Sequence, residues 1–345
     1  MRVLVAMSGG VDSSVAAALL VKAGHEVVGA TLKLWGGAGD SGCCSVADVD
    51  DARRVADQLG IDHRVLNFTE EFSADVVEPY VADHAAGRTP NPCVECNRAV
   101  KFGHLAARAR RLGFDAVATG HHARVGVGGG RVTLRRGVDP AKDQSYVLAT
   151  LRAPDIARVL MPVGEFTKAA VRELAARFRL RTAAKPDSQD VCFIASRSPG
   201  TGRSAFLAER IPLHPGRVVD LATGAELARL TAVELVTVGQ RRGLGVAAGG
   251  RRYAVAVDVE KSTVVAGSQA DLLVEGVTFG ARTWFDAALP PGTPVEVQVS
   301  AHGVARRAVV TAGGIAYDRP ERRVAPGQVV ACYSGDMVVG SGIAA

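Results

Sequence analysis

A short polar turn near the N-terminus, Ser8–Ser14, constrains the fold of this chain more than any other stretch. It follows an apolar run, Val3–Ala6, whose length is typical of a buried parallel strand. The apolar segment after it, 15–23, predicts a helix that ends at Gly24. The chain should therefore open with a strand, a turn and a helix, which begins a βαβ unit.

The residue types in this turn favour a phosphate site. Gly9 and Gly10 allow backbone N–H groups to approach a ligand, and Ser13 and Ser14 add hydroxyl donors at the start of a helix. The turn lacks the Gly-Lys-Ser/Thr of a Walker A loop and the G-x-G-x-x-G of a dinucleotide site. The alternative is a plain glycine-containing turn that has an Asp/Ser cap but no ligand.

Length and composition narrow the class of protein. A chain of 345 residues usually forms two or three domains, and a net charge of +6 is compatible with a polyanionic partner. No apolar run approaches the roughly 20 residues of a membrane span, and the first residues do not resemble a signal peptide. Six unevenly spaced cysteines are not a disulfide framework, so we expect a cytoplasmic enzyme with a few functional thiols.

Alternating strands and helices fill the N-terminal half of the chain. Parallel strands joined by helices predict right-handed βαβ units in an open sheet. Because ligands of such sheets bind at the carboxyl ends of the strands, the turn, Leu32 and Gly120 should share one cleft. The further predicted strands are 27–32, 64–68 and 116–119, and the further predicted helices are 46–59, 70–86 and 98–112.

The pattern changes after Gly137. Thr167 is a predicted N-cap for a helix to Arg179, and the chain becomes rich in β-type residues from about 204. Short alternating strands from about 272 predict a small antiparallel barrel. The predicted fold is thus an α/β domain with an open parallel sheet, a small β-rich middle domain and a C-terminal antiparallel β-barrel. The expected domain ranges are 1–203, 204–270 and 271–345.

The pair Cys93-x-x-Cys96 admits several interpretations. A zinc site would need two more ligands at closed-site spacing, and a thioredoxin-type pair should open a helix after a strand instead of following Pro-Asn-Pro. With Cys192, the pair could supply three thiolates to an iron–sulfur cluster, or one cysteine could act as a nucleophile with Cys192. Inert buried thiols are the expectation for Cys332 and for Cys43 and Cys44, but not for Cys93 and Cys96, because a Pro/Asn turn is not part of a core.

Motifs spread in order over nearly the whole chain then point to one family. The turn Ser8–Ser14 is followed by Gly87–Pro92, Cys96–Asn97, Lys101–Phe102, Thr119–His121, Lys142–Tyr146, Asp187–Ser188, Cys192–Ile194, Gly239–Gly245 and Pro326–Gln328. With these motifs the sequence resembles the tRNA-specific 2-thiouridylases, which belong to the ATP pyrophosphatase (PP-loop) superfamily. The resemblance implies adenylation of the 2-oxygen of the wobble uridine of tRNA by ATP, with magnesium.

The resemblance also assigns roles to residues. Cys192 would carry a persulfide sulfur, and Cys96 would be the nucleophile that frees the sulfur by forming a disulfide with Cys192. No residue is implied as a metal ligand. The implied ATP-binding residues are Ala6, Met7, Ser8, Gly9, Gly10, Val11, Asp12, Ser13, Leu32 and Gly120. Asn91, Pro92 and Cys93 would face the target base, and His121, Lys142, Asp143, Gln144 and Gln328 would contact the tRNA.

The implied partners are tRNA, with lysine, glutamate and glutamine acceptors, and a cysteine desulfurase or sulfur-relay protein. Two positions depart from the family pattern: Cys93 stands where many relatives have Asp, and Ser300-Ala301 stands where relatives often have Arg-Tyr. The thiol at 93 keeps a 4Fe-4S version of the thiolation conceivable. The rival functions are another adenylating enzyme, such as an amide ligase or a different tRNA thiolase, and a non-enzymatic nucleotide- or RNA-binding protein.

Overall fold

The computed structural model describes residues 1–36, 45–128, 130–187, 191–194, 202–246 and 250–345. Cys43, Cys44 and Ser188 lie outside the described residues. The chain divides into two compact units. The first unit comprises Met1–Val77, Pro92–Gly202 and Gly335–Val339, and the second comprises Glu78–Asn91, Arg203–Ser334 and Gly340–Ala345.

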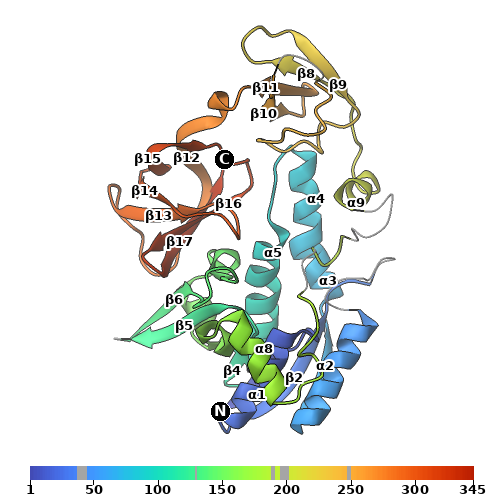
Figure 1. Ribbon diagram of the computed structural model, residues 1–345, viewed down its shortest axis with the longest axis vertical. Coiled ribbons are helices and arrows are strands. Elements are labelled where there is room, and N and C mark those ends of the chain that lie inside the picture. The colour runs from blue at the N-terminus through green and yellow to red at the C-terminus, as the bar shows by residue number, and fades with distance from the viewer. Residues whose placement is uncertain (37–44, 129, 188–190, 195–201, 247–249) are drawn as a thin grey trace. The chain divides into compact units, whose positions relative to one another are not determined.

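A five-stranded sheet in the order β3-β2-β1-β4-β7 forms the centre of the first unit (Figure 1). All its pairings are parallel, which confirms the predicted open parallel sheet. The central strand β1 is buried on both faces: Val3 and Val5 are fully buried on one face, and Leu4 on the other face is only 2% exposed. The strands are β1 (Arg2–Ala6), β2 (Glu26–Lys33), β3 (Asp62–Asn67), β4 (Ala116–Ala118) and β7 (Val159–Leu160).

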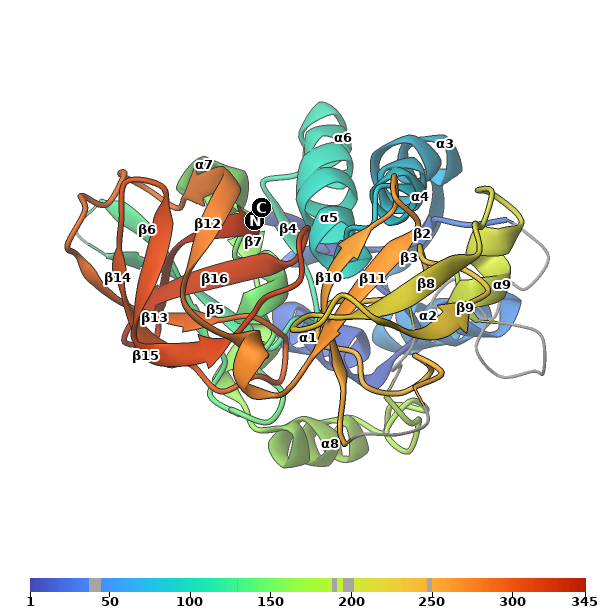
Figure 2. The same cartoon turned by 90° about the horizontal axis from the view of Figure 1, so that it is seen from above.

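Helices cover both faces of this sheet. Figures 1 and 2 show α1, α2 and α8 on one face and α5 and α6 on the other. Apolar side chains of β1, α1, α2 and α8 share one core, in which Val15, Ala16 and Val171 are fully buried. The helices on the first face are α1 (Val11–Lys22), α2 (Val46–Leu59) and α8 (Lys168–Arg177).

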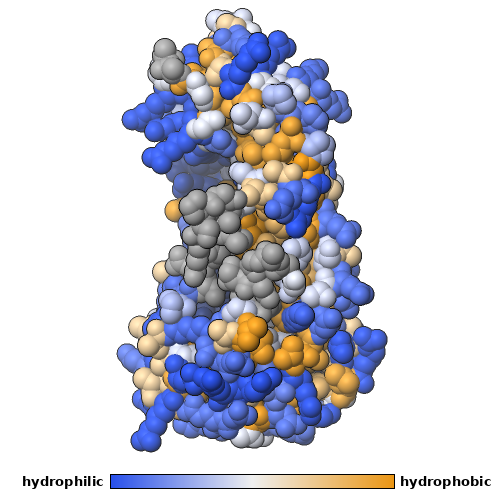
Figure 3. All heavy atoms as spheres, turned by 90° about the vertical axis from the view of Figure 1, so that its right-hand side faces the viewer, coloured by the Kyte–Doolittle hydropathy of each residue, from blue (hydrophilic) through white to orange (hydrophobic). Residues whose placement is uncertain are grey.

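The amphipathic helix α2 shows how the sequence sets the ends and the orientation of an element. The hydroxyl of Ser45 caps its first turn by accepting from the N–H of Asp48, and Gly60 ends it in the left-handed conformation. Ala52 and Val55 face the core, whereas the other side of the helix carries charged residues. Hydrophilic side chains accordingly dominate the lower part of the face in Figure 3, at the height of α2 in Figure 1.

The helical segments after β3 differ from the prediction in two ways. Both contain π-helical turns, which apolar spacing alone does not reveal. The second segment begins at Pro92 and not at about Arg98, because proline is favourable at the first position of a helix. The segments are α3 (Thr69–Phe72), the π-helix Ser73–Val77 and α4 (Glu78–Ala85), then α5 (Pro92–Glu95), the π-helix Cys96–Leu105 and α6 (Ala106–Arg111).

Further elements complete the first unit. Strands β5 and β6 form an antiparallel hairpin. The polar cluster that begins at Lys142 leads into a short 3-10 helix, Ser145–Leu148. The hairpin strands are β5 (Ala123–Gly128) and β6 (Arg131–Arg136), and the remaining short helices are α7 (Ala153–Ile156) and the 3-10 helix Pro162–Glu165.

The second unit contains α9 (Arg203–Ala208), a four-stranded sheet and a barrel. The sheet has the order β10-β11-β8-β9 and packs Val218, Val233 and Leu244 into its own core. The barrel is antiparallel and closes because β12 pairs with both β15 and β17, which confirms the predicted C-terminal barrel. The sheet strands are β8 (Gly216–Asp220), β9 (Glu226–Leu230), β10 (Tyr253–Asp258) and β11 (Thr263–Gly267); the barrel strands are β12 (Leu273–Trp284), β13 (Pro294–Gln298), β14 (Arg306–Val310), β15 (Gly314–Arg322), β16 (Val329–Ser334) and β17 (Met337–Ala344).

In the part of the chain that the structure describes, no helix has both the length and the apolar character needed to cross a membrane.

Candidate functional site

The turn between β1 and α1 is shaped for a ligand. Helix α1 begins at Val11, four residues before the predicted start, and no side chain caps its N-terminus at Gly10. Gly9 has a φ of 72°, and a Cβ at this position would lie 2.2 Å from the carbonyl oxygen of Asp48. Only glycine therefore fits here. The partial positive charge of the uncapped helix start favours an anion.

The serines of the turn stabilise its shape. Ser14 is fully buried and donates its hydroxyl proton to the carbonyl oxygen of Gly10 at 2.8 Å. Ser13 donates to the same oxygen at 3.2 Å and accepts from the backbone N–H of Ser8 at 3.3 Å. A Cβ on Gly120 would lie 2.6 Å from the backbone nitrogen of Ser13. The end of β4 therefore lies directly against the turn, as the topology predicts.

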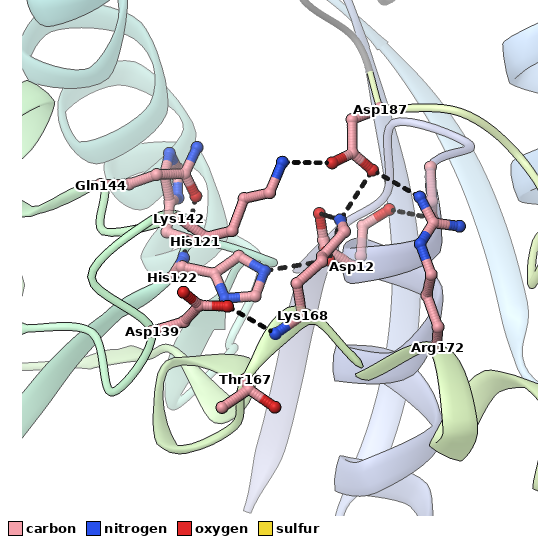
Figure 4. Close-up of polar contacts among 12 residues, drawn as sticks. Asp12, His121, His122, Asp139, Lys142, Gln144, Thr167, Lys168, Arg172 and Asp187 are labelled. Carbon is pink, nitrogen blue, oxygen red and sulfur yellow. Dashed lines mark hydrogen bonds and ion pairs between the residues drawn. The ribbon is translucent and has the colours of Figure 1, made fainter. Parts of the chain in front are cut away.

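A charged network begins at Asp12, in the first turn of α1 (Figure 4). His122 places Nε2 3.0 Å from one oxygen of the Asp12 carboxylate, and the Lys168 ammonium donates to both oxygens at 2.8 and 2.7 Å. Burial alone would raise the pKa of Asp12, but the hydrogen bonds from His122 and Lys168 outweigh burial and lower it. Asp12 is therefore held as a carboxylate beside the turn.

Asp187 is the second anion of this network. Lys142 and Lys168 place their ammonium nitrogens 2.8 and 2.9 Å from its carboxylate oxygens, and Arg172 donates to it at 2.8 Å. Burial opposes ionisation of Asp187, but the hydrogen bonds from Lys142 and Lys168 lower its pKa to about 2. Figure 4 shows these cations converging on Asp187 from two sides.

The segment that carries Asp187 is also tied to α2. The ammonium of Lys185 donates to Asp48 at 2.6 Å and to Asp51 at 2.8 Å. Burial would lower the pKa of Lys185, but these two carboxylates raise it. Lys185 and Asp187 are two residues apart, and each forms ion pairs with other elements. These ion pairs therefore hold in place the segment that precedes Cys192.

The residues assigned to tRNA in the first unit are enclosed to different degrees. The carboxylate of Asp143 accepts from the backbone N–H groups of Gly137 and Ser145, and the side-chain oxygen of Gln144 accepts from the backbone N–H of His122. Both side chains thus hold local turns. His121 is buried, and burial lowers its pKa well below the usual value, so its imidazole is neutral.

The cysteines differ sharply in their surroundings. Cys93 is exposed and Cys96 is buried, and both lie on the helical segment that starts at Pro92. The interpretation that a Pro/Asn turn keeps both thiols out of the core is therefore wrong for Cys96. Cys192 is partly exposed, while burial raises the pKa of Cys332 to about 12 and makes it an inert thiol.

The remaining assigned residues are placed as follows. Leu32 lies in β2, next to β1, with 8% of its surface exposed. Asn91 and Gln328 belong to the second unit, where Gln328 pairs its backbone with Ala344. Among the described residues, no group of three or more histidine, cysteine or acidic side chains is placed to hold a metal ion.

The sequence reasoning missed Lys168, Arg172 and His122. Lys168 and Arg172 follow the predicted cap Thr167 on α8 at a spacing of four, which places both on one face of the helix. That face was a detectable signal. The contact with Asp12 was not, because it joins positions 156 residues apart.

Three family models together match most of the chain. The family model described as tRNA methyl transferase HUP domain matches residues 1–196. The models described as tRNA methyl transferase PRC-barrel domain and aminomethyltransferase beta-barrel domain match residues 204–268 and 276–344.

Curated relatives match at nearly full length. The tRNA-specific 2-thiouridylase MnmA of Rhodococcus jostii (strain RHA1) is 48% identical over 99% of this chain and 97% of its own. That of Mycobacterium avium (strain 104) is 49% identical over 99% of this chain and 98% of its own. That of Roseiflexus sp. (strain RS-1) is 44% identical over 99% and 98%. Because such relatives span the whole chain, the chain belongs to the family of tRNA-specific 2-thiouridylases.

Proposed function

We propose that this protein is a tRNA-uridine 2-sulfurtransferase, which uses ATP to replace the 2-oxygen of the wobble uridine with sulfur. The observation that carries the proposal is the full-length identity of about 48% to proteins named 2-thiouridylases, together with the presence of the turn Ser8–Ser14 and of Cys96 and Cys192 in this chain. ATP would lie along the turn, Leu32 and Gly120. The products would be 2-thiouridine in tRNA, AMP and pyrophosphate.

Adenylation is the step that the first unit is suited to promote. The 2-oxygen of uridine is a poor leaving group, and attack of this oxygen on the α-phosphorus of ATP turns it into part of AMP, a good one. The uncapped start of α1 favours the phosphates of ATP, whose negative charge increases in the transition state. Asp12, held ionised beside the turn, can meet a magnesium ion carried by ATP, since Mg²⁺ usually binds one or two carboxylates plus phosphate oxygens.

Sulfur transfer would use two cysteines. The terminal sulfur of a persulfide on Cys192 attacks carbon 2, and AMP leaves with the former 2-oxygen. The thiolate of Cys96 then attacks the Cys192 sulfur, the persulfide S–S bond breaks, and its electron pair stays with the sulfur on carbon 2. The result is a Cys96–Cys192 disulfide and the 2-thio group. A cellular thiol must then reduce the disulfide, and a cysteine desulfurase or relay protein must supply the next sulfur.

The remaining assignments belong to the same proposal. Asn91, Pro92 and Cys93 would face the base, and exposed Cys93 is suited to such a position. His121, Lys142, Asp143, Gln144 and Gln328 would contribute to the tRNA-binding surface, Asp143 and Gln144 through the turns they hold. The expected domain ranges 1–203, 204–270 and 271–345 and a cytoplasmic location complete the proposal.

The direct test is mass spectrometry of nucleosides. Unmodified tRNA with a lysine, glutamate or glutamine acceptor is incubated with the protein, ATP, Mg²⁺ and a persulfide donor. We expect ATP-dependent 2-thiouridine at the wobble position, with one AMP released per sulfur, and none in tRNA that carries cytidine there. Cys192→Ala should abolish the product, whereas Cys332→Ala, which removes an inert thiol, should retain it. Sulfur at another position, or AMP release without sulfur, would support a different adenylating enzyme.

A further inference from the structure

The ammonium of Lys168 occupies an unusual position beside the turn. It donates to both oxygens of Asp12 at 2.8 and 2.7 Å and lies 2.9 Å from an oxygen of Asp187. Only 12% of the Lys168 side chain is exposed. Asp12 is the second residue of α1, so this cation lies next to the uncapped helix start. A positive charge and an uncapped helix start in one place attract an anion.

Asp187 is an anion bound at this position. Its carboxylate forms ion pairs with Lys142, Lys168 and Arg172 at distances of 2.8 to 2.9 Å. The three cations face only two carboxylates, Asp12 and Asp187, so one positive charge is in excess and favours a further anion such as a polyphosphate. Figure 4 shows Lys142 and Arg172 reaching Asp187 from opposite sides.

We infer that Lys168 binds the polyphosphate of ATP, and that Asp187 is the internal anion which occupies Lys168 until the nucleotide displaces it. The inference rests on the proposed function, because it takes the turn Ser8–Ser14 to be the ATP site. Nucleotide binding is then an exchange of anions around Lys168. Lys142 and Arg172 are released from Asp187 in the same exchange. Asp187 lowers ATP affinity because its cations must be released first.

Two substitutions separate this exchange from a purely structural ion pair. Lys168→Met removes the cation and should weaken ATP binding about 10- to 100-fold, the range for one charge-assisted contact. AMP binding should stay nearly unchanged because AMP lacks the β- and γ-phosphates. Lys261→Met, which removes an exposed surface ammonium, is the matched control and should bind both nucleotides as the wild type does.

Asp187→Asn should act in the opposite direction. The neutral amide competes poorly for the three cations, so ATP should bind about 5- to 30-fold tighter. A structural residue or a magnesium ligand would show weaker ATP binding in the same variant. Lys168→Arg, which keeps the charge, should retain most of the ATP affinity.

The measurement is calorimetric titration of the full chain with ATP and with AMP, with circular dichroism as the check of folding. Unchanged ATP affinity in folded Lys168→Met, or weakened affinity in Asp187→Asn, would overturn the inference while leaving the proposed function intact. If Lys168→Met does not fold, the ATP affinities of Asp187→Asn and Lys168→Arg still test the inference. Wild-type protein that binds neither nucleotide would refute the proposed ATP site, and the inference with it.

Discussion

The ion pairs of Asp187 predict a specific loss of stability when its charge is removed. The carboxylate has a pKa of about 2 in the folded chain, against 3.8 for an unperturbed aspartate. Its ionised form therefore stabilises the fold above about pH 4, and this contribution is lost as the pH falls through about 2. Asp187→Asn imitates the protonated carboxyl at every pH.

The expected magnitude follows from the shift. Lowering a pKa from 3.8 to about 2 is worth about 2 kcal/mol at pH 7. The Asp187 side chain is 22% exposed, and solvent screens part of this energy. We therefore expect the nucleotide-free variant to be less stable than the wild type by about 1 to 2 kcal/mol at pH 7, with the difference shrinking towards zero near pH 2.

The assay needs a probe confined to the first unit. The chain has two tryptophans, and Trp35 packs near Phe193 with ring centroids 6.1 Å apart. In a Trp284→Phe background, Trp35 fluorescence during urea unfolding reports on the first unit alone. Asp115→Asn is the matched control, because it neutralises a carboxylate of the same unit that lies outside this network. Equal stability of wild type and Asp187→Asn at pH 7, or a difference that does not change with pH, would refute the reasoning.

Two further predictions concern the cysteines and the tRNA. Cys93→Ser should keep most 2-thiouridine formation. With a persulfide donor alone, Cys96→Ser should carry one extra sulfur on Cys192, visible by intact-protein mass spectrometry; with ATP and tRNA added, it should stall with the uridine sulfur still bonded to Cys192, as an adduct that a reducing thiol releases. An inactive Cys93→Ser together with stoichiometric iron and sulfide in anaerobic wild type would favour the cluster instead. The affinity for tRNA should fall as the salt concentration rises, because Lys and Arg contacts to phosphates release counterions. Removal of the chain beyond about 272 should weaken tRNA binding more than ATP binding. Filter binding at several salt concentrations measures the tRNA affinity of the full and the truncated chain, and equal tRNA affinity in the truncated protein would contradict the role given to the barrel.

Much of the fold could be read from the sequence because its signals are local. The apolar run Val3–Ala6, the two glycines and the alternation of strands and helices sufficed for the parallel sheet. The start of the helix at Pro92 and its π-helical turns could not be read, because they depend on how the segment packs. For the same reason the burial of Cys96 was unexpected.

The sequence allowed the turn of the site to be predicted, but not the charged residues around it. The turn and Gly120 carry their own chemical pattern, since glycine is required where backbones approach each other closely. The partners of Asp12 carry no such pattern, because His122 and Lys168 meet it across 110 and 156 residues of chain. Only the fold brings these charges together, and only the three-dimensional structure shows that Asp187 shares them.

Stability and affinity are linked through Asp187. If ATP takes over its cations, the energy that Asp187 contributes to the nucleotide-free fold is absent from the complex. Asp187→Asn should then lose stability without ATP and gain ATP affinity by the equivalent factor. At saturating ATP, wild type and variant should therefore unfold with nearly the same free energy, measured by the same Trp35 fluorescence. A deficit of about 1 to 2 kcal/mol that persists at saturating ATP would mean that Asp187 keeps its cations in the complex, and the exchange of anions would be wrong.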